Sequence, residues 1–335
     1  MALNEKKLIE RIQQGARKAE PTAARLLPAR LLCGIGDDCA RLALPAGYET
    51  IVTTDFTIEN VHFRRQWHPP EVVGHRCLAR GLSDIAAMGG KPVSAFLSLA
   101  LPAGTETRWV DKFLSGMLAL AEKSGVALAG GDTTESPGGI LADIVVLGIV
   151  PSGQAILRSG AQAGDSIHVT GELGAAMALC ERMYAEPEKK YRPASCPAHF
   201  YPQPQLAIGQ YLREHKLATA MIDISDGLST ELSHICEESG TGAVLWASAI
   251  PIASIGRRKL ELRQALHGGD EYQLLFTSPK GRRLPKAIAG VPVTRIGEIM
   301  AGGGLLLEEA GGQRTKLTPG GWQHFDRQKT RRSKH

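Results

Sequence analysis

Apolar residues recur along the first half of the chain in two alternating patterns. Four short apolar runs have the length and composition of strands: 49–55, 93–101, 126–132 and 141–150. Residues 71–88 and 107–123 instead carry apolar side chains at helical spacing, and Gly125 follows the second segment where a C-cap is expected. This alternation of helices and strands predicts an α/β domain.

The second half repeats the mixture after a break. Residues 151–165 are punctuated by Pro, Gly and Ser and form the candidate domain boundary. Beyond it, we expect strand-like runs at 166–170, 218–223 and 272–278, a helix from Leu228 to about Gly240, and a hairpin turning at Gly311-Gly312. A length of 335 residues favours two domains, 1–150 and 151–325. Residues 186–204 carry five prolines and are expected to form an irregular excursion.

Charge and cysteine content exclude several classes. The net charge of +5 comes from the five Lys and Arg residues of the segment 326–335, which predicts a solvated, disordered tail and no nucleic-acid-binding face. Six cysteines form no C-x-x-C pair, which suits reduced thiols in the cytoplasm. The apolar runs are far too short to span a membrane, so no membrane partner is expected.

Acidic residues gather where apolar runs end, often behind glycine. The pattern appears in GIGDD (34–38), TTD (53–55), AGGD (129–132), IDISDG (222–227) and HGGDE (267–271), with Asp84 on a predicted helix. Two carboxylates about 4 Å apart repel by about 4 kcal/mol at an effective dielectric near 20, so a shared site needs cations. Oxygen ligands without a His or Cys cluster favour Mg²⁺. The alternative is that each Asp is an independent turn or N-cap residue, as Asp226 could be.

Other nucleotide-site and catalytic motifs are missing. The sequence has no P-loop, no H-E-x-x-H and no G-x-S-x-G, and GIGDDC lacks the third glycine of a dinucleotide-binding fingerprint.

Eight segments, in order and spacing, resemble the thiamine-monophosphate kinase family: GIGDDCARL, TTDFTIENVHF, LSDIAAMGGKP, GGDTTESP, LRSGAQAGD, IDISDGLSTEL, GGDEYQLLFT and GWQHF. That family belongs to the aminoimidazole-ribotide-synthetase-like ATP-binding superfamily. The resemblance covers residues 30–325 and implies two mixed α/β (α+β type) domains, the N-terminal ones pairing in a homodimer. It also implies ATP-dependent phosphorylation of thiamine monophosphate to thiamine diphosphate.

The resemblance implies roles for individual residues. Several Mg²⁺ ions would be held by eight residues: Asp38, Thr53, Thr54, Asp55, Asp84, Asp132, Asp223 and Asp226. Gly131, Asp132, Arg158 and Ser225 would contact ATP, and His62, Asp270 and Trp322 would surround thiamine monophosphate. The alternative for Arg158 is a surface ion pair, and for Trp322 core packing. No residue is assigned as a general base, because the acceptor phosphate is already largely dianionic at neutral pH.

Two departures from the family pattern affect the substrate contacts. The chain reads GGDEYQ where the family usually has Gly-Gly-Glu-Asp-Tyr-Glu, so either Asp270 or Glu271 could meet the substrate. Asn60 replaces a usual glycine, but Asn tolerates a left-handed backbone, so we expect the turn to be kept.

Two questions remain open at this stage. Within the acid pair of GIGDD, we expect Asp38 to face the metal and Asp37 to brace the turn, because neighbouring residues of an extended segment point to opposite sides. Alternative functions are a phosphotransferase or synthetase of the same fold with another acceptor, or a nucleotide-binding regulator without catalysis.

Overall fold

The computed structural model describes residues 5–19, 29–36 and 38–325, which fall into two compact units. The first unit contains residues up to Leu157 together with Met183–Ala218, and the second contains Arg158–Arg182 and the chain from Thr219. The expectations for Asp37 and for the tail 326–335 lie outside the described residues. In the described part, no helix is both long and apolar enough to cross a membrane.

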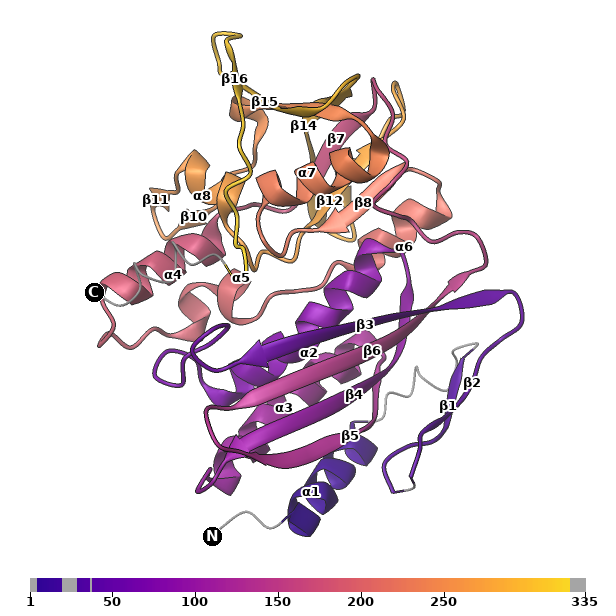
Figure 1. Cartoon of the computed structure of the whole chain (residues 1–335), viewed down its shortest axis with the longest axis vertical. Coiled ribbons are helices and arrows are strands. Elements are labelled where there is room, and N and C mark those ends of the chain that lie inside the picture. Colours follow the sequence, from indigo (N-terminus) through magenta and orange to yellow (C-terminus); the bar gives the residue numbers. More distant parts are fainter. Residues whose placement is uncertain (1–4, 20–28, 37, 326–335) are drawn as a thin grey trace. The chain divides into compact units, whose positions relative to one another are not determined.

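A four-stranded sheet forms the centre of the first unit (Figure 1). Its order is β3 (Tyr48–Ile58), β6 (Leu141–Pro151), β4 (Lys91–Pro102) and β5 (Ala127–Ser136). The β3–β6 and β6–β4 pairs are antiparallel, and β4–β5 is parallel. A separate hairpin of β1 (Arg30–Cys33) and β2 (Arg41–Ala43) flanks the GIGDD segment.

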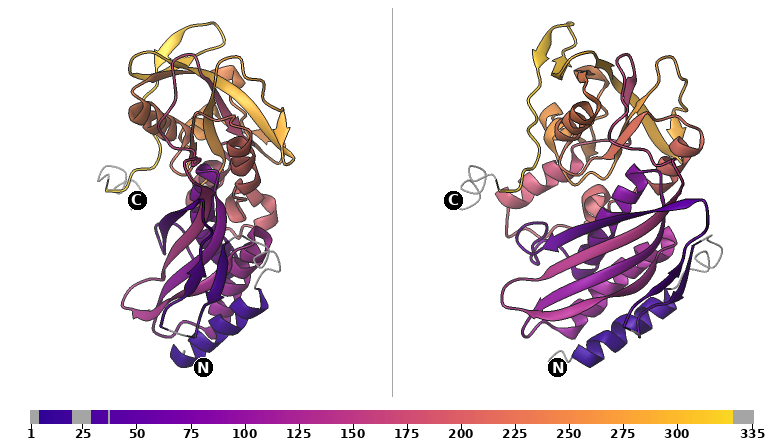
Figure 2. Two further views of the ribbon diagram at one scale, coloured as in Figure 1. Left: turned by 90° about the vertical axis from the view of Figure 1, so that its right-hand side faces the viewer. Right: turned by 45° about the vertical axis from the view of Figure 1, so that its right-hand side comes forward.

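Two long helices, α2 (Pro70–Ala87) and α3 (Thr107–Ser124), pack on one face of this sheet (Figures 1 and 2). Close approach depends on glycine: a Cβ at Gly81 would lie 2.7 Å from Val146 of β6, and one at Gly74 only 1.9 Å from the carbonyl oxygen of Phe113. The side chains between sheet and helices form the core of the unit, together with Leu8 and Ile12 of α1 (Glu5–Lys18).

The Pro-rich excursion belongs to the first unit. Its short helices η2 (Pro193–Ser195) and α5 (Pro197–Phe200) precede α6 (Leu206–Glu214). The indole N–H of Trp67 donates to the carbonyl of Pro187 at 3.1 Å, and the buried rings of His68 and His199 meet at 3.0 Å between their Nε2 atoms. We expected one break, after residue 150, with everything beyond it in the second domain. The structure instead assigns the segment 183–218 to the first unit, so the chain passes between the units more than once and the predicted boundary is corrected.

The second unit is built on a larger sheet of the order β16-β15-β9-β14-β7-β12-β8, with β13 paired to β14. Its strands are β7 (Ser166–Thr170), β8 (Ala220–Asp223), β9 (Gly242–Trp246), β12 (Leu274–Ser278), β13 (Ala287–Ile288), β14 (Val291–Met300), β15 (Gly304–Glu308) and β16 (Arg314–Lys316). The other elements are α4 (Ala175–Ala185), α7 (Leu228–Ser239), η3 (Ala247–Ala249), α8 (Leu262–His267) and the hairpin of β10 (Ser254–Ile255) and β11 (Arg258–Lys259).

The predicted mixed α/β class is confirmed, and so are several local features. Gly125 ends α3 in the left-handed conformation (φ 71°), and Gly312 (φ 79°) lies in the turn of the antiparallel β15–β16 hairpin. One expected end is wrong: β3 continues to Ile58, because its register with β6 runs on to Leu141. Asp55 therefore lies within a strand and not at its end.

Candidate active site

The carboxylates of Asp55 and Asp84 come together in the first unit. Asp55 lies on β3, on the sheet face that packs against α2, and Asp84 lies on α2. The hydroxyl of Thr53 donates a hydrogen bond to Asp84 Oδ2. Arg80 Nε of the same helix is 3.7 Å from Asp55 Oδ1, so one cation already stands beside the pair.

The pKa of Asp55 is raised to about 7, mainly by burial and then by the neighbouring Asp84, whereas Arg80 opposes this rise. The folded protein thus retains a proton at a group that would ionise near pH 4 in the unfolded chain. When both carboxylates of such a pair are ionised, their negative charges repel, and a divalent cation bound between them would compensate this repulsion.

Thr54 lies on the opposite face of the same strand. Its hydroxyl donates to Asp143 Oδ1 of β6 at 2.8 Å. The three consecutive residues Thr53, Thr54 and Asp55 are therefore not on one side of the sheet, because side chains alternate along a strand. Asp143 was not identified from sequence, although an acid inside the apolar run 141–150 was a signal for it.

Gly131 and Asp132 lie in β5, beside Leu97 and Ser98 of the parallel strand β4. Gly131 has φ 150°, and a Cβ there would lie 1.8 Å from the carbonyl oxygen of Leu97. Asp132 is exposed, and its Oδ1 accepts the N–H of Thr133 at 2.8 Å. Asp38, in the GIGDD loop, is also exposed.

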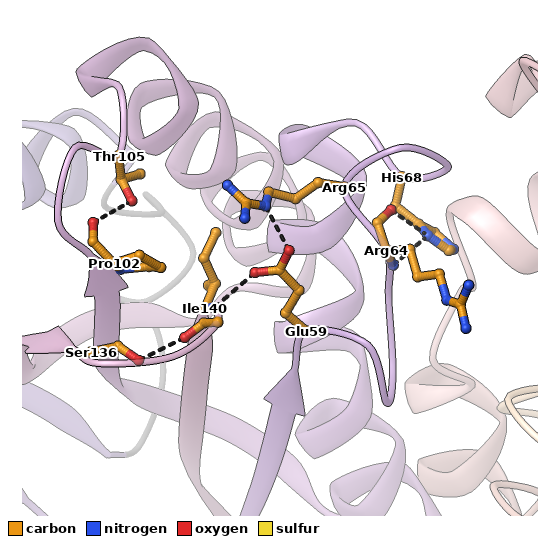
Figure 3. Close-up of polar contacts among 9 residues, drawn as sticks. Glu59, Arg64, Arg65, His68, Pro102, Thr105, Ser136 and Ile140 are labelled. Carbon is orange, nitrogen blue, oxygen red and sulfur yellow. Dashed lines mark hydrogen bonds and ion pairs between the residues drawn. The ribbon is translucent and has the colours of Figure 1, made fainter. Parts of the chain in front are cut away.

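His62 belongs to the loop between β3 and α2. The Ile58 N–H donates to its Nδ1 at 3.0 Å, so the neutral ring carries its proton on Nε2. Asn60 has φ 65°, which confirms that it keeps the expected left-handed turn. Glu59 fixes the start of the loop: its carboxylate accepts from Arg65 Nε at 2.6 Å and from the Ile140 N–H at 2.9 Å (Figure 3).

In the second unit, the IDISDG loop between β8 and α7 connects four of the predicted residues. The Ser225 carbonyl accepts the N–H of Asp270 at 2.7 Å, and the Asp226 carbonyl accepts the N–H of Trp322 at 2.9 Å. Residues from three distant stretches of sequence are thus joined by backbone hydrogen bonds. Asp223, which is 3% exposed, ends β8 directly before this loop.

The indole of Trp322 is exposed over 48% of its surface, so it is not a core side chain. Gly321 makes this possible, because a Cβ there would lie 2.1 Å from the Asp226 carbonyl oxygen. Arg158 is also exposed, and its charge acts on the imidazole of His234 in α7. The indole N–H of Trp322 donates to the ring of His324 at 3.3–3.4 Å, and the two rings meet edge to face.

Asp270 and Glu271 have different environments. Asp270 is half-buried, has φ 60°, and its Oδ1 accepts the hydroxyl of Tyr272 at 2.6 Å. Glu271 is buried, and its Oε1 accepts the N–H groups of Gly174 and Ala176 at the start of α4, at 2.8 and 3.2 Å. The carboxylate of Glu271 therefore holds the start of α4 in place. The sequence alone could not show which of the two acids has this structural role.

We expect Glu271→Gln to flatten the pH dependence of stability. Burial raises the pKa of Glu271 to about 8, although the two backbone N–H groups lower it. The folded state binds more protons than the unfolded state between about pH 4.5 and 8, so its stability falls as the pH rises through that window. Gln accepts the same N–H groups without titrating. Melting temperatures of both proteins from pH 5 to 9 test this, and parallel curves would contradict it.

The eight predicted metal ligands do not form a ready cluster. Within residues 5–19, 29–36 and 38–325, no group of three or more His, Cys, Asp or Glu side chains could hold a metal ion as they lie. Six ligands belong to the first unit and two, Asp223 and Asp226, to the second. Asp55 and Asp84 are one pair of predicted carboxylate ligands whose side chains interact.

Comparison with known proteins places the chain among enzymes of one kind. Residues 36–150 match the family model "AIR synthase related protein, N-terminal domain". The thiamine-monophosphate kinase of Escherichia coli K12 is 36% identical over 87% of this chain and 91% of its own. The crystal structure of thiamine-monophosphate kinase from Stenotrophomonas maltophilia K279a is 35% identical, covers 92% of this chain and 98% of its own, and superimposes with a TM-score of 0.78.

A third similar protein was solved with ligands bound. AaThiL, complexed with AMPPCP and TMP, is 31% identical, with a TM-score of 0.74 over 84% of this chain and 89% of its own.

Proposed function

Because the chain belongs to the thiamine-monophosphate kinase family, it phosphorylates thiamine monophosphate with ATP, and we propose that the transfer is direct, Mg²⁺-assisted and yields thiamine diphosphate. The observation that carries this proposal is the identity with the E. coli enzyme, which extends over 87% of the chain. The AaThiL complex supports it, since AMPPCP is an ATP analogue and was bound together with TMP.

The reaction needs positioning more than a base. The γ-phosphoryl group moves from ATP to an oxygen of the acceptor phosphate, which has a second pKa of about 6 and is largely dianionic at neutral pH. No proton has to be removed from the nucleophile, and the barrier comes from bringing two polyanions together. The residues proposed for Mg²⁺ and ATP agree with this, because they offer carboxylates, hydroxyls, a guanidinium and the backbone of Gly131, and no residue is assigned as a general base.

The donors present suit Mg²⁺. The proposed ligands offer oxygen only. The proton on Asp55 compensates the negative charge of the Asp55–Asp84 pair, and a hard divalent cation would take the place of that proton. In the first unit the proposed ligands are Asp38, Thr53, Thr54, Asp55, Asp84 and Asp132. In the second unit they are Asp223 and Asp226. When bound, Mg²⁺ neutralises phosphate charge and orients the transferred group.

The nucleotide contacts are proposed for Gly131, Asp132, Arg158 and Ser225. Gly131 has no side chain, so a ligand can approach its backbone closely. Its φ of 150° is one that few other residues adopt. The planar guanidinium of Arg158 is exposed and matches phosphate oxygens in a bidentate manner.

For thiamine monophosphate we propose His62, Asp270 and Trp322. Asp270 is favoured over Glu271 because the Glu271 carboxylate is buried against α4. Trp322 offers an exposed indole face on which the heteroaromatic rings of the substrate can stack.

The test is a product assay. Purified protein incubated with ATP, Mg²⁺ and thiamine monophosphate should release ADP and form equimolar thiamine diphosphate, identified by mass spectrometry. Free thiamine should give no product, because the acceptor is a phosphate oxygen. ADP release with a different phosphorylated acceptor and none with thiamine monophosphate would favour the alternative acceptor, and tight ATP binding without turnover would favour a regulator.

We also propose that the first units pair in a homodimer through the sheet face opposite α2 and α3. Val52 and Phe56, on one face of β3, are 62% and 54% exposed. Val145 and Leu147 of the neighbouring β6 are half-buried on the same side. These apolar side chains flank the Thr54–Asp143 hydrogen bond on the same face, and exposed apolar side chains gathered in this way are typical of a protein interface. We further propose a cytoplasmic location, because all six cysteines are free thiols.

We expect Phe56→Lys to convert the protein to a monomer. A buried interface would have to desolvate the new ammonium group on each copy without a partner. Light scattering coupled to size-exclusion chromatography measures the mass of the variant and of an Ile9→Lys control, which replaces an exposed apolar residue of α1. The proposal fails if wild type is monomeric, or if Phe56→Lys stays dimeric.

A further inference from the structure

Glu231 is a buried acid that no predicted role explains. It lies in the first turn of α7 and is 2% exposed. Its Oε1 accepts the Asp226 N–H at 2.9 Å and the Ser225 hydroxyl at 3.2 Å, and its Oε2 lies 3.1 Å from His234 Nδ1. One carboxylate thus contacts both the residue proposed for Mg²⁺ and the residue proposed for ATP.

Backbone hydrogen bonds also hold this loop. The Ile224 N–H donates to Gln273, and the carbonyls of Ser225 and Asp226 accept from Asp270 and Trp322. Gly227 caps α7 without a side-chain hydrogen bond, and its φ of 127° allows the sharp entry into the helix. Glu231 therefore supplies a side-chain acceptor from within the helix to the loop that precedes it.

A packing role alone does not account for this residue. Burying a carboxylate costs far more than burying an apolar side chain of the same volume, unless its oxygens are hydrogen-bonded. Here the oxygens are used on Ser225, Asp226 and His234, so the burial is offset only while the loop keeps this conformation. Without an acceptor, the hydroxyl of Ser225 and the N–H of Asp226 could turn toward other partners.

We propose that Glu231 is a positioning residue that fixes Ser225 and Asp226 in the orientation needed for nucleotide binding. The inference rests on the proposed function, because the roles of Ser225 and Asp226 come from it. Glu231 itself does not touch the substrates.

Three variants of the full chain test the proposal. Glu231→Ala removes the acceptor, Glu231→Gln keeps an amide oxygen for Ser225 and Asp226, and Glu238→Gln is a matched control at an exposed position of the same helix. Two measurements do not depend on turnover: hydrogen exchange of the peptide that covers 224–227, and calorimetric binding of AMPPCP with and without Mg²⁺. Steady-state assays then give kcat and KM for ATP.

For Glu231→Ala we expect faster exchange at 224–227 and AMPPCP binding weakened about tenfold or more, the factor that one hydrogen bond to a charged acceptor supplies. Its KM for ATP should rise, while KM for thiamine monophosphate changes less. Glu231→Gln should bind AMPPCP within about threefold of wild type, and Glu238→Gln should match wild type.

Two results would overturn the proposal: wild-type exchange and AMPPCP affinity in folded Glu231→Ala, or a Glu231→Gln protein as impaired as Glu231→Ala. If Glu231→Ala does not fold, Glu231→Gln and Glu231→Asp decide, since Asp is one methylene too short to keep both contacts and should show the defect. A wild-type protein that binds AMPPCP but does not phosphorylate thiamine monophosphate would refute the proposed function and leave this test intact.

Discussion

Replacing Asp55 by Asn should lower turnover on the order of 10³-fold and at the same time stabilise the Mg²⁺-free protein. The loss of activity follows from removing a charged oxygen from the proposed metal ligands, since electrostatic stabilisation is the main catalytic contribution in phosphoryl transfer. The gain in stability follows first from the burial of the ionised Asp55 carboxylate and then from the neighbouring Asp84. A proposed metal ligand thus opposes folding of the metal-free protein, and the two effects have opposite signs in one variant.

The sign of the stability change depends on pH. The pKa of Asp55 is raised to about 7, mainly by burial and then by Asp84, so the folded state loses stability as the pH rises from about 4 to 7. Above pH 7 the buried Asp55 carboxylate is ionised in the wild-type protein. The Asn variant should therefore be more stable at pH 8 by roughly 1–2 kcal/mol; the full shift would correspond to about 4 kcal/mol, but water screens a side chain that is 26% exposed.

Calorimetric melting at pH 5 and pH 8 in the presence of a chelator measures this change, and the product assay measures turnover. Asp111→Asn is the matched control, because it makes the same chemical change at an exposed acid that pairs with Arg11. The control should keep wild-type turnover and gain no stability at pH 8. Full activity in Asp55→Asn would remove Asp55 from the metal ligands, and a lower melting temperature at pH 8 would show that Arg80 dominates its environment.

Local features of the fold were predictable where one residue decides them. Gly125 and Asn60 have the left-handed conformations that their positions suggested. The end of β3 was not predictable in this way, because the strand continues for as long as β6 offers partners. The prolines of 186–204 predicted an irregular excursion, but the return of the longer segment 183–218 to the first unit depends on contacts such as Trp67 with Pro187, which are far apart in sequence.

For the site, the sequence indicated the residue types but not their partners. Glycine followed by an acid marked Asp132 and Asp270, yet nothing local showed that Asp55 would share its environment with Asp84 of the next helix. Nothing in the sequence distinguishes Glu231 from an acid that only complements the helix dipole in the first turn of a helix. The two acids of GGDEYQ are distinguished only by burial, which encloses Glu271 and leaves Asp270 half-buried, and the proposal of Asp270 rests on this difference.

Gly131→Ala should be the most damaging single-methyl change in the first unit. The new Cβ would lie 1.8 Å from the carbonyl oxygen of Leu97, and the backbone φ of 150° is one that alanine rarely adopts. Neither atom can move alone, because Gly131 and Leu97 are paired in the parallel β5–β4 ladder. Overpacking and backbone strain together should cost about 3 kcal/mol or more.

The same shift would displace Asp132, the next residue of β5, so nucleotide binding should be lost along with stability. Gly138→Ala is the control: it adds the same methyl group in the β5–β6 connection, where nothing lies within 4 Å of a new Cβ. We expect the melting temperature of Gly131→Ala to fall by roughly 6 °C or more and that of Gly138→Ala to stay near wild type. AMPPCP titration at a temperature where both variants are folded separates the two effects. Wild-type affinity in a destabilised Gly131→Ala would show that the close approach of β5 to β4 serves packing alone, and that Gly131 has no part in holding the nucleotide.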